Sequence, residues 1–377
     1  MSVEEAAERI ASSEFVRIAA HADADGVASA ACLCSALSSL GIGYHFTALE
    51  EPSSVVEVDA DVFCDLGAAY LDRIDDAVVI DHHPPSDVEG FDGVLAGTDA
   101  SSSSVAAHRV ASRMSSGNPV AALVGALGDG ANLDDENFSD IVDEAVETGA
   151  EREEGARLVG ETSVEKLAYS TRPFTRLSGD YEAAREFVDD LDEDDLSTAV
   201  VLLALTQEAS RAEAVAELVG DVYLFPSEVY LHELSRYVET CAVSGKHGLA
   251  LSLCLDPEAH LEEARKAWRA FESNVIEKVR SASVEDGGES EASFARVKGD
   301  FDTGAVADVL YDWVTGDVVV VNEDGDASFR AETFDCGRVA REAARLVDGE
   351  GGGHKSRAGA SFDVPRDEFI KAVRRVL

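Results

Sequence analysis

Residues 15–26 read FVRIAAHADADG and join an apolar run to a cluster of histidine and aspartate side chains. The apolar run 15–20 is short, which predicts a buried strand. The next residues, 26–40, are rich in Ala and Leu and stop at Gly41, as a helix does. A strand that ends in a polar loop and leads into a helix is typical of the start of an α/β domain.

The same alternation continues through the first third of the chain. We expect further strands at 45–50, 60–67, 77–83 and 93–97, and helices at 103–114 and 120–127. Repeated alternation of strands and helices predicts the fold class, an α/β domain with a doubly wound, mainly parallel sheet.

The rest of the chain divides into two further regions. Residues 131–245 are very acidic and largely helical in pattern, with expected helices that include 150–160 and 227–241. Residues 246–377 show a second, smaller α/β pattern. Its expected elements are strands at 248–255, 294–297 and 361–364, helices at 258–280, 304–314, 336–347 and 366–376, and a hairpin around NEDGD (322–326). We therefore expect three regions, 1–130, 131–245 and 246–377.

The net charge of the chain indicates the salt conditions in which the protein is stable. The formal net charge is −44, and only seven of the 31 basic residues are Lys. The acidic residues are spread along the chain, which indicates a folded surface rather than a charged tail. Such a surface is stable where salt screens its self-repulsion, and the pattern resembles proteins of salt-accumulating haloarchaea. Because nucleic acid repels an acidic surface, a nuclease of this composition needs metal ions, Arg side chains and backbone amides at its site.

The sequence also bears on location and redox state. No stretch approaches about 18 consecutive apolar residues, and the start, MSVEEAAERI, lacks the features of a signal peptide. We therefore expect a cytoplasmic protein with no membrane partner. The six cysteines form no CxxC pair, so buried free thiols are expected and a zinc site is not.

Acidic and histidine side chains lie at the ends of the expected elements. They follow the strand 15–20, lie near the end of 60–67, end 77–83, and follow the helix 120–127. The carboxyl ends of parallel strands meet at one edge of a sheet. We therefore expect these side chains in one crevice: His21, Asp23, Asp25, Asp65, Asp81, His82, His83 and Asp129.

Five carboxylates and three imidazoles in one crevice repel one another unless cations bind among them. The mixed oxygen and nitrogen donors suit Mn²⁺, with Mg²⁺, Co²⁺ or Zn²⁺ as weaker candidates. Two ions about 3.5–4 Å apart can share a carboxylate and activate water against a phosphoryl group. An Asp-rich loop alone is more commonly a turn or a helix cap. Four such pieces, each at the end of an element, favour a two-metal centre.

A second signal is GGGHKSRAG at 351–359. Its three glycines let backbone amides approach an anion closely, and His354, Lys355 and Arg357 add donors. A helix-capping loop is the alternative, since glycines form those as well. Arg330, on the expected strand 327–331, is either a further phosphate contact or a salt-bridged surface residue.

These motifs resemble one family. HADADG (21–26), DLG (65–67), DHH (81–83) and GD (128–129), followed by GGGH (351–354), are similar to the DHH phosphoesterases. GGGH fits the DHH-associated C-terminal domain of RecJ-like nucleases, and LAYSTRPF (167–174) resembles archaeal RecJ-like proteins, including the GINS-associated nuclease. The resemblance covers nearly the whole chain, most strongly 15–130 and 290–360.

The resemblance implies an activity and a role for each matching residue. It implies a two-metal exonuclease on single-stranded DNA or RNA, acting in DNA repair or replication, with a GINS-type replication factor as a candidate partner. One metal is expected on His21 and Asp23, the second on Asp25, His82 and Asp129, with Asp65 bridging both. His83 is expected to face the scissile phosphate, and Asp81 to orient a histidine. Substrate phosphate is expected at Arg330, Gly352, Gly353 and His354, with the active site in a cleft between the DHH domain and the C-terminal domain.

One element departs from the family pattern. RecJ-like proteins usually carry an Asn-Ala-x-Gly-Arg element where the linker meets the second domain. The corresponding stretch here is ETCAVSGKHG (239–248), without that Asn or Arg. Substrate grip and cleavage polarity are therefore left open.

Two alternatives share the same motifs or fold. One is a nanoRNase-type enzyme that degrades very short oligonucleotides or nucleoside bisphosphates, for which activity falls with substrate length. The other is a non-catalytic replication scaffold, like the inactive RecJ-like subunit of the eukaryotic replicative helicase, which intact metal ligands disfavour. A family II pyrophosphatase is disfavoured because its C-terminal domain lacks GGGH.

Overall fold

The computed structural model describes residues 3–86, 90–191, 195–206, 210–225, 227–285, 292–299 and 301–377. The chain packs as two compact units. Unit 1 comprises Met1–Glu154 and Asp221–Trp268, and unit 2 comprises Gly155–Gly220 and Arg269–Leu377. This division reflects packing alone, so the expected functional regions with boundaries at 130 and 245 stay a prediction.

Unit 1 is built on a five-stranded parallel sheet in the order β2-β1-β3-β4-β5. Its strands are β1 (Phe15–His21), β2 (Gly43–Leu49), β3 (Val62–Cys64), β4 (Val78–Ile80) and β5 (Val94–Ala96). The chain passes from β2 to β3 across β1, so the winding direction of the sheet switches between β1 and β3. Doubly wound sheets bind ligands beside such a switch, outside the carboxyl ends of the strands. The predicted fold class is confirmed.

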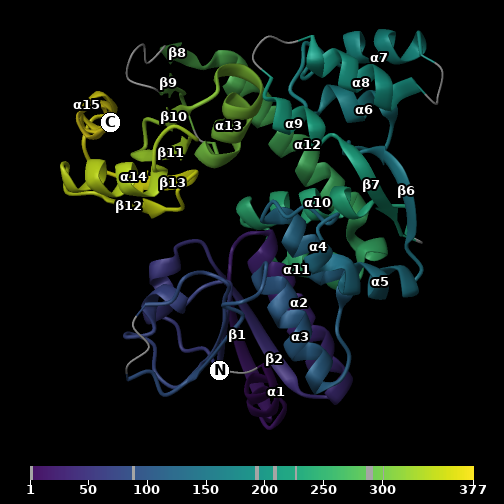
Figure 1. The fold of residues 1–377 in the computed structure, drawn as a ribbon, viewed down its shortest axis with the longest axis vertical. Coiled ribbons are helices and arrows are strands. Elements are labelled where there is room, and N and C mark those ends of the chain that lie inside the picture. The colour runs from purple at the N-terminus through teal and green to yellow at the C-terminus, as the bar shows by residue number, and fades with distance from the viewer. Residues whose placement is uncertain are drawn as a thin grey trace. The chain divides into compact units, whose positions relative to one another are not determined.

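The two faces of this sheet are covered differently. Figure 1 shows α2 (Ala24–Leu40) and α3 (Ser103–Met114) alongside the sheet, and α1 (Val3–Ala11) packs near β4 and β5. α2 is apolar on nearly all sides and is buried along most of its length. The register partners Ala19, Phe63 and Val79 point to the opposite face, where they pack with η1 (Pro52–Val56) and η2 (Ala68–Tyr70).

Further helices complete unit 1: α4 (Pro119–Gly128), η3 (Glu136–Phe138), α5 (Ser139–Glu147), α10 (Leu231–Val243), α11 (His247–Leu255) and the first half of α12 (Pro257–Ser281). α10 and α11 pack on α2 and α4. The expected helix 227–241 is thus α10, which begins at Leu231. None of the described helices is long and apolar enough to cross a membrane. All six cysteines are buried free thiols, as expected.

One strand prediction in unit 1 is wrong. Residues 248–255 were expected to form a strand but lie in helix α11. The buried residues of α11 are Ala250, Leu253 and Cys254, at the spacing of one helical face. A short apolar run does not by itself distinguish a strand from a buried helix, and this run has no β-branched residue that would favour a strand.

Unit 2 is built on a six-stranded mixed sheet in the order β12-β13-β11-β10-β9-β8. Its strands are β8 (Ser283–Glu285), β9 (Ser293–Arg296), β10 (Val318–Val321), β11 (Asp326–Arg330), β12 (Glu350–Gly353) and β13 (Arg357–Ser361). β9 and β10 are parallel, and the other pairs are antiparallel, including the expected β10–β11 hairpin.

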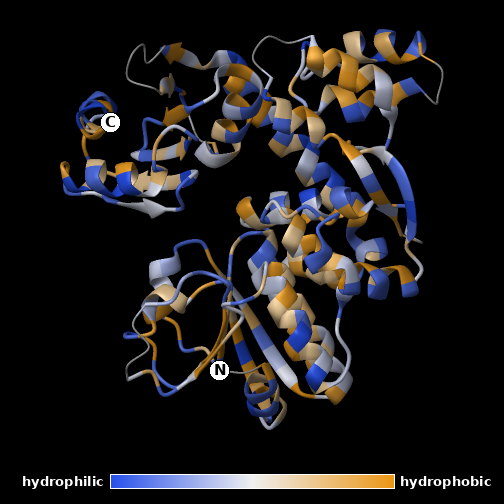
Figure 2. Ribbon diagram, viewed as in Figure 1, coloured by the Kyte–Doolittle hydropathy of each residue, from blue (hydrophilic) through white to orange (hydrophobic). Residues whose placement is uncertain are grey.

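Helices flank this sheet. α13 (Thr303–Leu310) and the following π turn η6 (Tyr311–Thr315) pack in one core, and α14 (Cys336–Arg345) and α15 (Arg366–Val376) pack in the other. Orange and blue residues alternate along α14 and α15 in Figure 2, as expected for helices with one buried side. The second half of α12 belongs to this unit together with α6 (Ser163–Ala168), α7 (Tyr181–Asp189), α8 (Leu196–Leu205) and α9 (Ala212–Ala216).

Two further sequence expectations in this half of the chain are wrong. The glycines 351–353 lie in strand β12, which pairs with β13, rather than in a loop. A glycine is needed at 351 because a Cβ there would lie 2.6 Å from the carbonyl oxygen of Ala340 on α14. The expected strand 361–364 is only the end of β13, which begins earlier, at Arg357.

Residues 150–160, expected to be helical, instead contain strand β6 (Glu151–Ala156), which pairs with β7 (Val219–Leu224). β6 is hydrophilic along most of its length in Figure 2. The glycines at 149, 155 and 160 interrupt this segment and disfavour a helix. The chain passes between the units within β6, within β7 and within α12.

Candidate metal centre

The first ligand candidates follow β1 directly. His21 is the last residue of β1, and Asp23 caps α2 by accepting a hydrogen bond from the Gly26 backbone N–H at 2.9 Å. The other carboxylate oxygen of Asp23 lies 2.6 Å from Nδ1 of His21. Gly26 must be a glycine here, because a Cβ would lie 2.4 Å from the carbonyl oxygen of His21. The turn therefore brings the two side chains together.

Asp65 lies just after β3 and adopts a left-handed backbone conformation, with φ of 56°. A non-glycine residue pays roughly 1–3 kcal/mol for a sparsely populated conformation of this kind, although Asp tolerates it better than most. The turn places its carboxylate 3.6 Å from Nδ1 of His21 and 3.8 Å from Nε2 of His82. Asp65 therefore reaches histidines from two different strands.

The DHH triplet follows β4. Asp81 is buried and accepts hydrogen bonds from the Ala68 backbone N–H at 2.9 Å and the His83 backbone N–H at 3.0 Å. It also lies 2.8 Å from Nδ1 of His83. Burial raises the pKa of the Asp81 carboxyl, but the hydrogen bonds with His83 outweigh burial and leave that pKa lowered. The histidine that Asp81 orients is thus His83.

Asp25 and Asp129 complete the cluster on the other side. Both carboxylate oxygens of the buried Asp25 accept backbone N–H groups at the start of α3, from Ser103 at 2.7 Å and Ser104 at 3.0 Å. Asp129 caps the end of α4, and its carboxylate lies 3.5 Å from Nε2 of His82.

All the expected metal ligands therefore meet in unit 1. Three overlapping groups have donor atoms within 4.8 Å of one another: His21, Asp23 and Asp65; Asp25, His82 and Asp129; and Asp65, His82 and His83. The first two groups match the two metal sites expected from the sequence. Asp65 shares one group with His21 and Asp23 and another with His82 and His83, so its carboxylate lies between donors of the two expected sites.

The electrostatics of the cluster favour a cation. Burial raises the pKa of Asp65 well above its usual range, and the charges of Asp23 and Asp25 raise it further. Burial also raises the pKa of Asp25. Burial lowers the pKa of His21, but the charge and hydrogen bonds of Asp23 and Asp65 outweigh burial and raise that pKa to about 11. Carboxylates packed this closely need protons or cations among them.

His82 provides a direct test of whether a metal fits. Its Nε2 atom is buried and has no hydrogen-bond partner among the described residues. Burial lowers the pKa of the imidazole, which favours the neutral form that binds metals. An unpartnered imidazole nitrogen with carboxylates of Asp65 and Asp129 at 3.8 and 3.5 Å fits a divalent cation.

Ser103 is a site residue that the sequence reasoning missed. Its hydroxyl donates to the Asp65 carboxylate at 2.8 Å and accepts from the His82 backbone N–H at 3.1 Å, while its own backbone N–H bonds Asp25. One serine therefore holds three of the ligand candidates. The run SSSS at 101–104, directly before an expected helix, was the available signal.

The expected substrate-binding residues lie in unit 2. Gly352 and Gly353 end strand β12, and His354 follows in the exposed turn to β13, where its carbonyl oxygen accepts from the Gly337 backbone N–H at 2.9 Å. Arg330 ends β11, and its Nε lies 2.5 Å from the carboxylate of Asp308. The salt-bridged alternative for Arg330 is therefore present, whether or not it also binds substrate.

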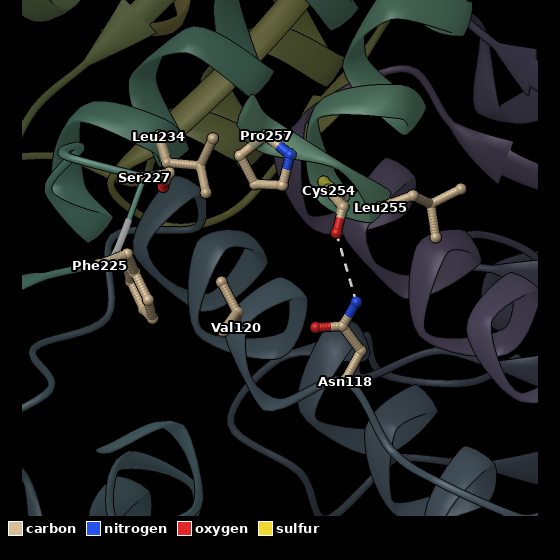
Figure 3. Close-up of a pocket in the computed structure, with 8 residues that line it drawn as sticks. All are labelled: Asn118, Val120, Phe225, Ser227, Leu234, Cys254, Leu255 and Pro257. Atoms are coloured by element: carbon tan, nitrogen blue, oxygen red, sulfur yellow. Dashed lines mark hydrogen bonds between the residues drawn. The ribbon is translucent and has the colours of Figure 1, made fainter. Parts of the chain in front are cut away.

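A separate pocket of about 230 Å³ lies in unit 1 between α4, α10 and α11. Figure 3 shows its mainly apolar lining, with Asn118 donating to the carbonyl oxygen of Cys254 at 3.3 Å. None of the metal-ligand candidates lines it. Burial holds the pKa of the Cys254 thiol well above its usual range, so this pocket offers no nucleophile at neutral pH.

Solved structures share this fold. RecJ in complex with Mn²⁺ from Thermus thermophilus matches with a TM-score of 0.62 and 18% identity, over 99% of this chain and 54% of the RecJ chain. CDC45 from Entamoeba histolytica matches with a TM-score of 0.66 and 9% identity, over 99% of this chain and 97% of CDC45. The PF0399 DHH domain matches with a TM-score of 0.59 and 15% identity, over 98% and 88% of the two chains. This chain thus spans about half of the Thermus RecJ.

Sequence relatives extend the similarity. The family of the C-terminal domain of the uncharacterized protein rrnAC1427 matches residues 290–375. The rrnAC1427 protein of Haloarcula marismortui is 24% identical over 283 residues, or 72% of this chain and 74% of the relative. The uncharacterized protein MJ0831 of Methanocaldococcus jannaschii is 23% identical in an alignment of 411 residues that covers 96% of this chain and 93% of the relative.

Together these similarities show the fold of the DHH-domain proteins, as the motifs predicted. The archaeal GINS-associated type and a haloarchaeal source stay predictions.

Proposed function

We propose that this protein is a metal-dependent DHH-type phosphoesterase that hydrolyses single-stranded DNA or RNA as an exonuclease. The proposal rests chiefly on one observation. The unpartnered Nε2 of His82 lies beside Asp65 and Asp129, within a cluster in which Asp65 also groups with His21 and Asp23. A purely structural cluster would leave that buried nitrogen without a hydrogen-bond partner and the carboxylates in mutual repulsion.

The cluster has donors for two divalent ions. His21 and Asp23 would hold one, Asp25, His82 and Asp129 the other, and Asp65 both. When bound, such ions supply Lewis acidity that activates water and neutralises phosphoryl charge near neutral pH. The donor set suits Mn²⁺, with Mg²⁺ or Co²⁺ as substitutes. Structures of the Thermus RecJ, which has the same fold, hold Mn²⁺ or Mg²⁺.

The remaining residues position the substrate. The Asp81 carboxylate fixes the His83 ring and raises the pKa of its imidazole, which favours a protonated ring that could donate to the scissile phosphate. Ser103 holds Asp25, Asp65 and the His82 backbone from behind. Arg330, Gly352, Gly353 and His354 of unit 2 are the proposed contacts to substrate phosphates.

End-labelled single strands test the proposal. Purified protein in Mn²⁺ and high KCl should shorten labelled DNA or RNA strands progressively, and Asp65→Ala should abolish the activity. Strands from the dinucleotide upward separate two readings. Activity that falls steeply with length would replace the exonuclease by an enzyme for very short oligonucleotides or nucleoside bisphosphates. No hydrolysis of any length, by protein with bound metal, would refute a phosphoesterase on nucleic acid.

A second candidate function is a non-catalytic replication scaffold, with a GINS-type factor as its partner. The observation that favours it is the likeness to CDC45, which extends over 97% of that chain. The two functions differ in catalytic turnover and in whether they need a metal ion. A scaffold predicts no catalytic turnover and no requirement for metal in partner binding.

A further inference from the structure

Three guanidinium groups gather on one carboxylate in unit 2. Asp308 of α13 lies 2.5 Å from Nε of Arg330, 3.3 Å from Nη2 of Arg172 and 3.8 Å from Nη2 of Arg357. Arg330 and Arg357 are register partners on β11 and β13, next to α13 (Figure 1). The chain has 75 acidic and 31 basic residues, so a cluster in which three arginines surround one aspartate reverses its overall balance of charge.

The three arginines differ in what occupies their donors. Arg330 is nearly buried, with 11% of its side chain exposed, and it also donates to the carbonyl oxygens of Phe329 at 3.0 Å and Gly304 at 3.4 Å. Arg172 and Arg357 are half exposed, at 50% and 52%. Each forms an ion pair with Asp308, and the charge of each also acts on Asp312. The guanidinium of Arg330 thus donates its hydrogen bonds within the fold, whereas the guanidinium groups of Arg172 and Arg357 are partly exposed to solvent.

Arg172 lies on a segment that several side-chain hydrogen bonds hold in place. On one side of it, the Thr171 hydroxyl donates to the buried carboxylate of Glu272 at 2.8 Å, and the Ser170 hydroxyl donates to the carbonyl oxygen of Pro173 at 2.9 Å. Farther along, Nε of Arg280 donates to the carbonyl oxygen of Ser178 at 3.0 Å. The anchors Ser170 and Thr171 are buried while the Arg172 side chain is half exposed. A charged side chain held this way is pre-organised for a ligand.

We propose that Arg172 and Arg357, aligned by Asp308 and Arg330, bind a phosphate group of the nucleic-acid substrate. This inference rests on the proposed function and adds Arg172 and Arg357 to its substrate contacts. Arg330 acts as a positioning residue, because it holds Asp308 in place. The planar guanidinium forks suit bidentate hydrogen bonds to phosphate oxygens. They also offer a grip on substrate in a chain that lacks the family's arginine near residue 243.

The neighbouring charges permit an anion here. Asp312, Asp302 and Glu332 lie near the arginines, but Arg211 pairs with Asp312 and Glu332, and Asp302 caps α13 through the Ala305 backbone N–H. The pairs of Arg172 and Arg357 with Asp308, at 3.3 and 3.8 Å, are longer than the pair of Arg330 at 2.5 Å, and the guanidinium groups of Arg172 and Arg357 are half exposed. A phosphate can therefore meet these two guanidinium groups while Arg330 keeps its pair with the buried Asp308 carboxylate.

Binding of a fluorescent single strand to the full-length protein tests the inference separately from hydrolysis. Arg172→Gln and Arg357→Gln should each weaken binding roughly 10-fold, as expected for losing a charged hydrogen bond, and should flatten its salt dependence by about 0.7 in slope. Arg172→Lys should give an intermediate loss, because the charge remains without the fork. Metal content should not change in any of these variants.

Arg176→Gln is the matched control, since Arg176 is exposed on the same segment but packs over the Phe187 ring. It should bind like the wild type. Equal affinity of the wild type, Arg172→Gln and Arg357→Gln would overturn the inference. If Arg172→Gln failed to fold, Arg172→Lys and Arg357→Gln would decide the same question. A wild type that binds strands through these arginines without cutting them would refute the proposed activity and leave the phosphate site standing.

Strands with and without terminal phosphates identify the phosphate that is bound. Equal losses for both kinds of strand mean an internal phosphodiester. A loss confined to strands with a terminal phosphate means that the arginines recognise the strand end.

Discussion

The carboxylate of Glu239 accepts a hydrogen bond from the backbone N–H of Ala24 at 2.7 Å. Ala24 is the first residue of α2 and lies between the ligand candidates Asp23 and Asp25. Glu239 is on α10, more than two hundred residues away in sequence, and occupies the start of the stretch that departs from the family's Asn-containing element. Its contact holds the turn from which these two ligand candidates project.

Glu239→Ala should therefore weaken Mn²⁺ binding by about 10-fold, in the range known for partners of metal ligands. Glu239→Gln keeps an oxygen that accepts the same N–H and should restore most of the affinity. Isothermal titration with Mn²⁺ measures both. Equal weakening in the two variants would mean that the carboxylate charge, and not the hydrogen bond, is what matters.

Asp65→Ala should lower the metal content more than any other single ligand substitution, because in the proposed assignment Asp65 contacts both ions, and its donor atoms group with His21 and Asp23 and with His82 and His83. Metal analysis after dialysis against Mn²⁺ checks this. Asp75→Ala, an exposed aspartate of the same unit, is the control and should keep the wild-type content. Full occupancy in Asp65→Ala would contradict the bridging role.

His354→Ala should weaken strand binding or raise KM while the metal content stays at the wild-type level. The reason is that His354 lies in unit 2 and every donor group lies in unit 1. His45→Ala removes an exposed histidine of β2 as a control. Loss of metal from His354→Ala would show that our separation of metal binding from substrate binding is wrong.

The Asp308 carboxylate should give unit 2 an acid-sensitive stabilisation. Burial raises the pKa of Asp308, but Arg330, Arg357 and Arg172 outweigh burial and hold that pKa well below its usual range. An unfolded Asp titrates near about 3.9, so the charged form stabilises the fold above that pH. This stabilisation is lost as the pH falls towards the lower pKa of the folded state.

Thermal melts of the wild type and Asp308→Asn across a pH series measure this effect. The difference in Tm should be largest near neutral pH and should narrow once the pH falls below about 4. Asp324→Asn, at an exposed aspartate of the same unit, should follow the wild type throughout. A difference in Tm that stays constant with pH would show that the carboxylate charge contributes nothing.

Stability should rise with KCl up to near-molar concentrations, because the net charge of −44 repels itself unless screened and the Debye length is ~3 Å at 1 M. Strand affinity should fall only shallowly over the same range, since close metal and hydrogen-bond contacts are screened less than a broad basic surface. Circular dichroism melts and binding titrations follow the two trends. Greatest stability in dilute buffer would refute adaptation to high salt.

The sequence predicted the sheet and the meeting of the ligand candidates well, because both depend on local patterns. His21, Asp65 and Asp81 each follow a short apolar run, and parallel topology alone brings the ends of such runs together. Asp129 was predicted from its place at a helix end. The helix α11 was mistaken for a strand because an eight-residue apolar run fits both, and only its packing on α2 and α4 decides.

Contacts between distant segments could not be predicted in this way. Glu239 meets Ala24, Glu272 meets Thr171, and Asp308 meets Arg172 across more than one hundred residues each. No period or motif marks such partners in a single sequence. The close packing of Gly351 on α14 is likewise a tertiary property, and the role of the glycines in binding substrate stays a prediction.

The interleaving of the two units has a consequence for synthesis on the ribosome. Unit 1 needs residues 221–268, so its first 154 residues must wait until a segment of unit 2 has already emerged. That segment, 155–220, carries the apolar helix α8 and lacks its partner residues 269–377 until those residues have been synthesised. Nascent chains therefore expose apolar surface for longer than two consecutive domains would. Any protein shortened at residue 154, 220 or 268 also loses part of a unit, so deletion from either end yields no intact half.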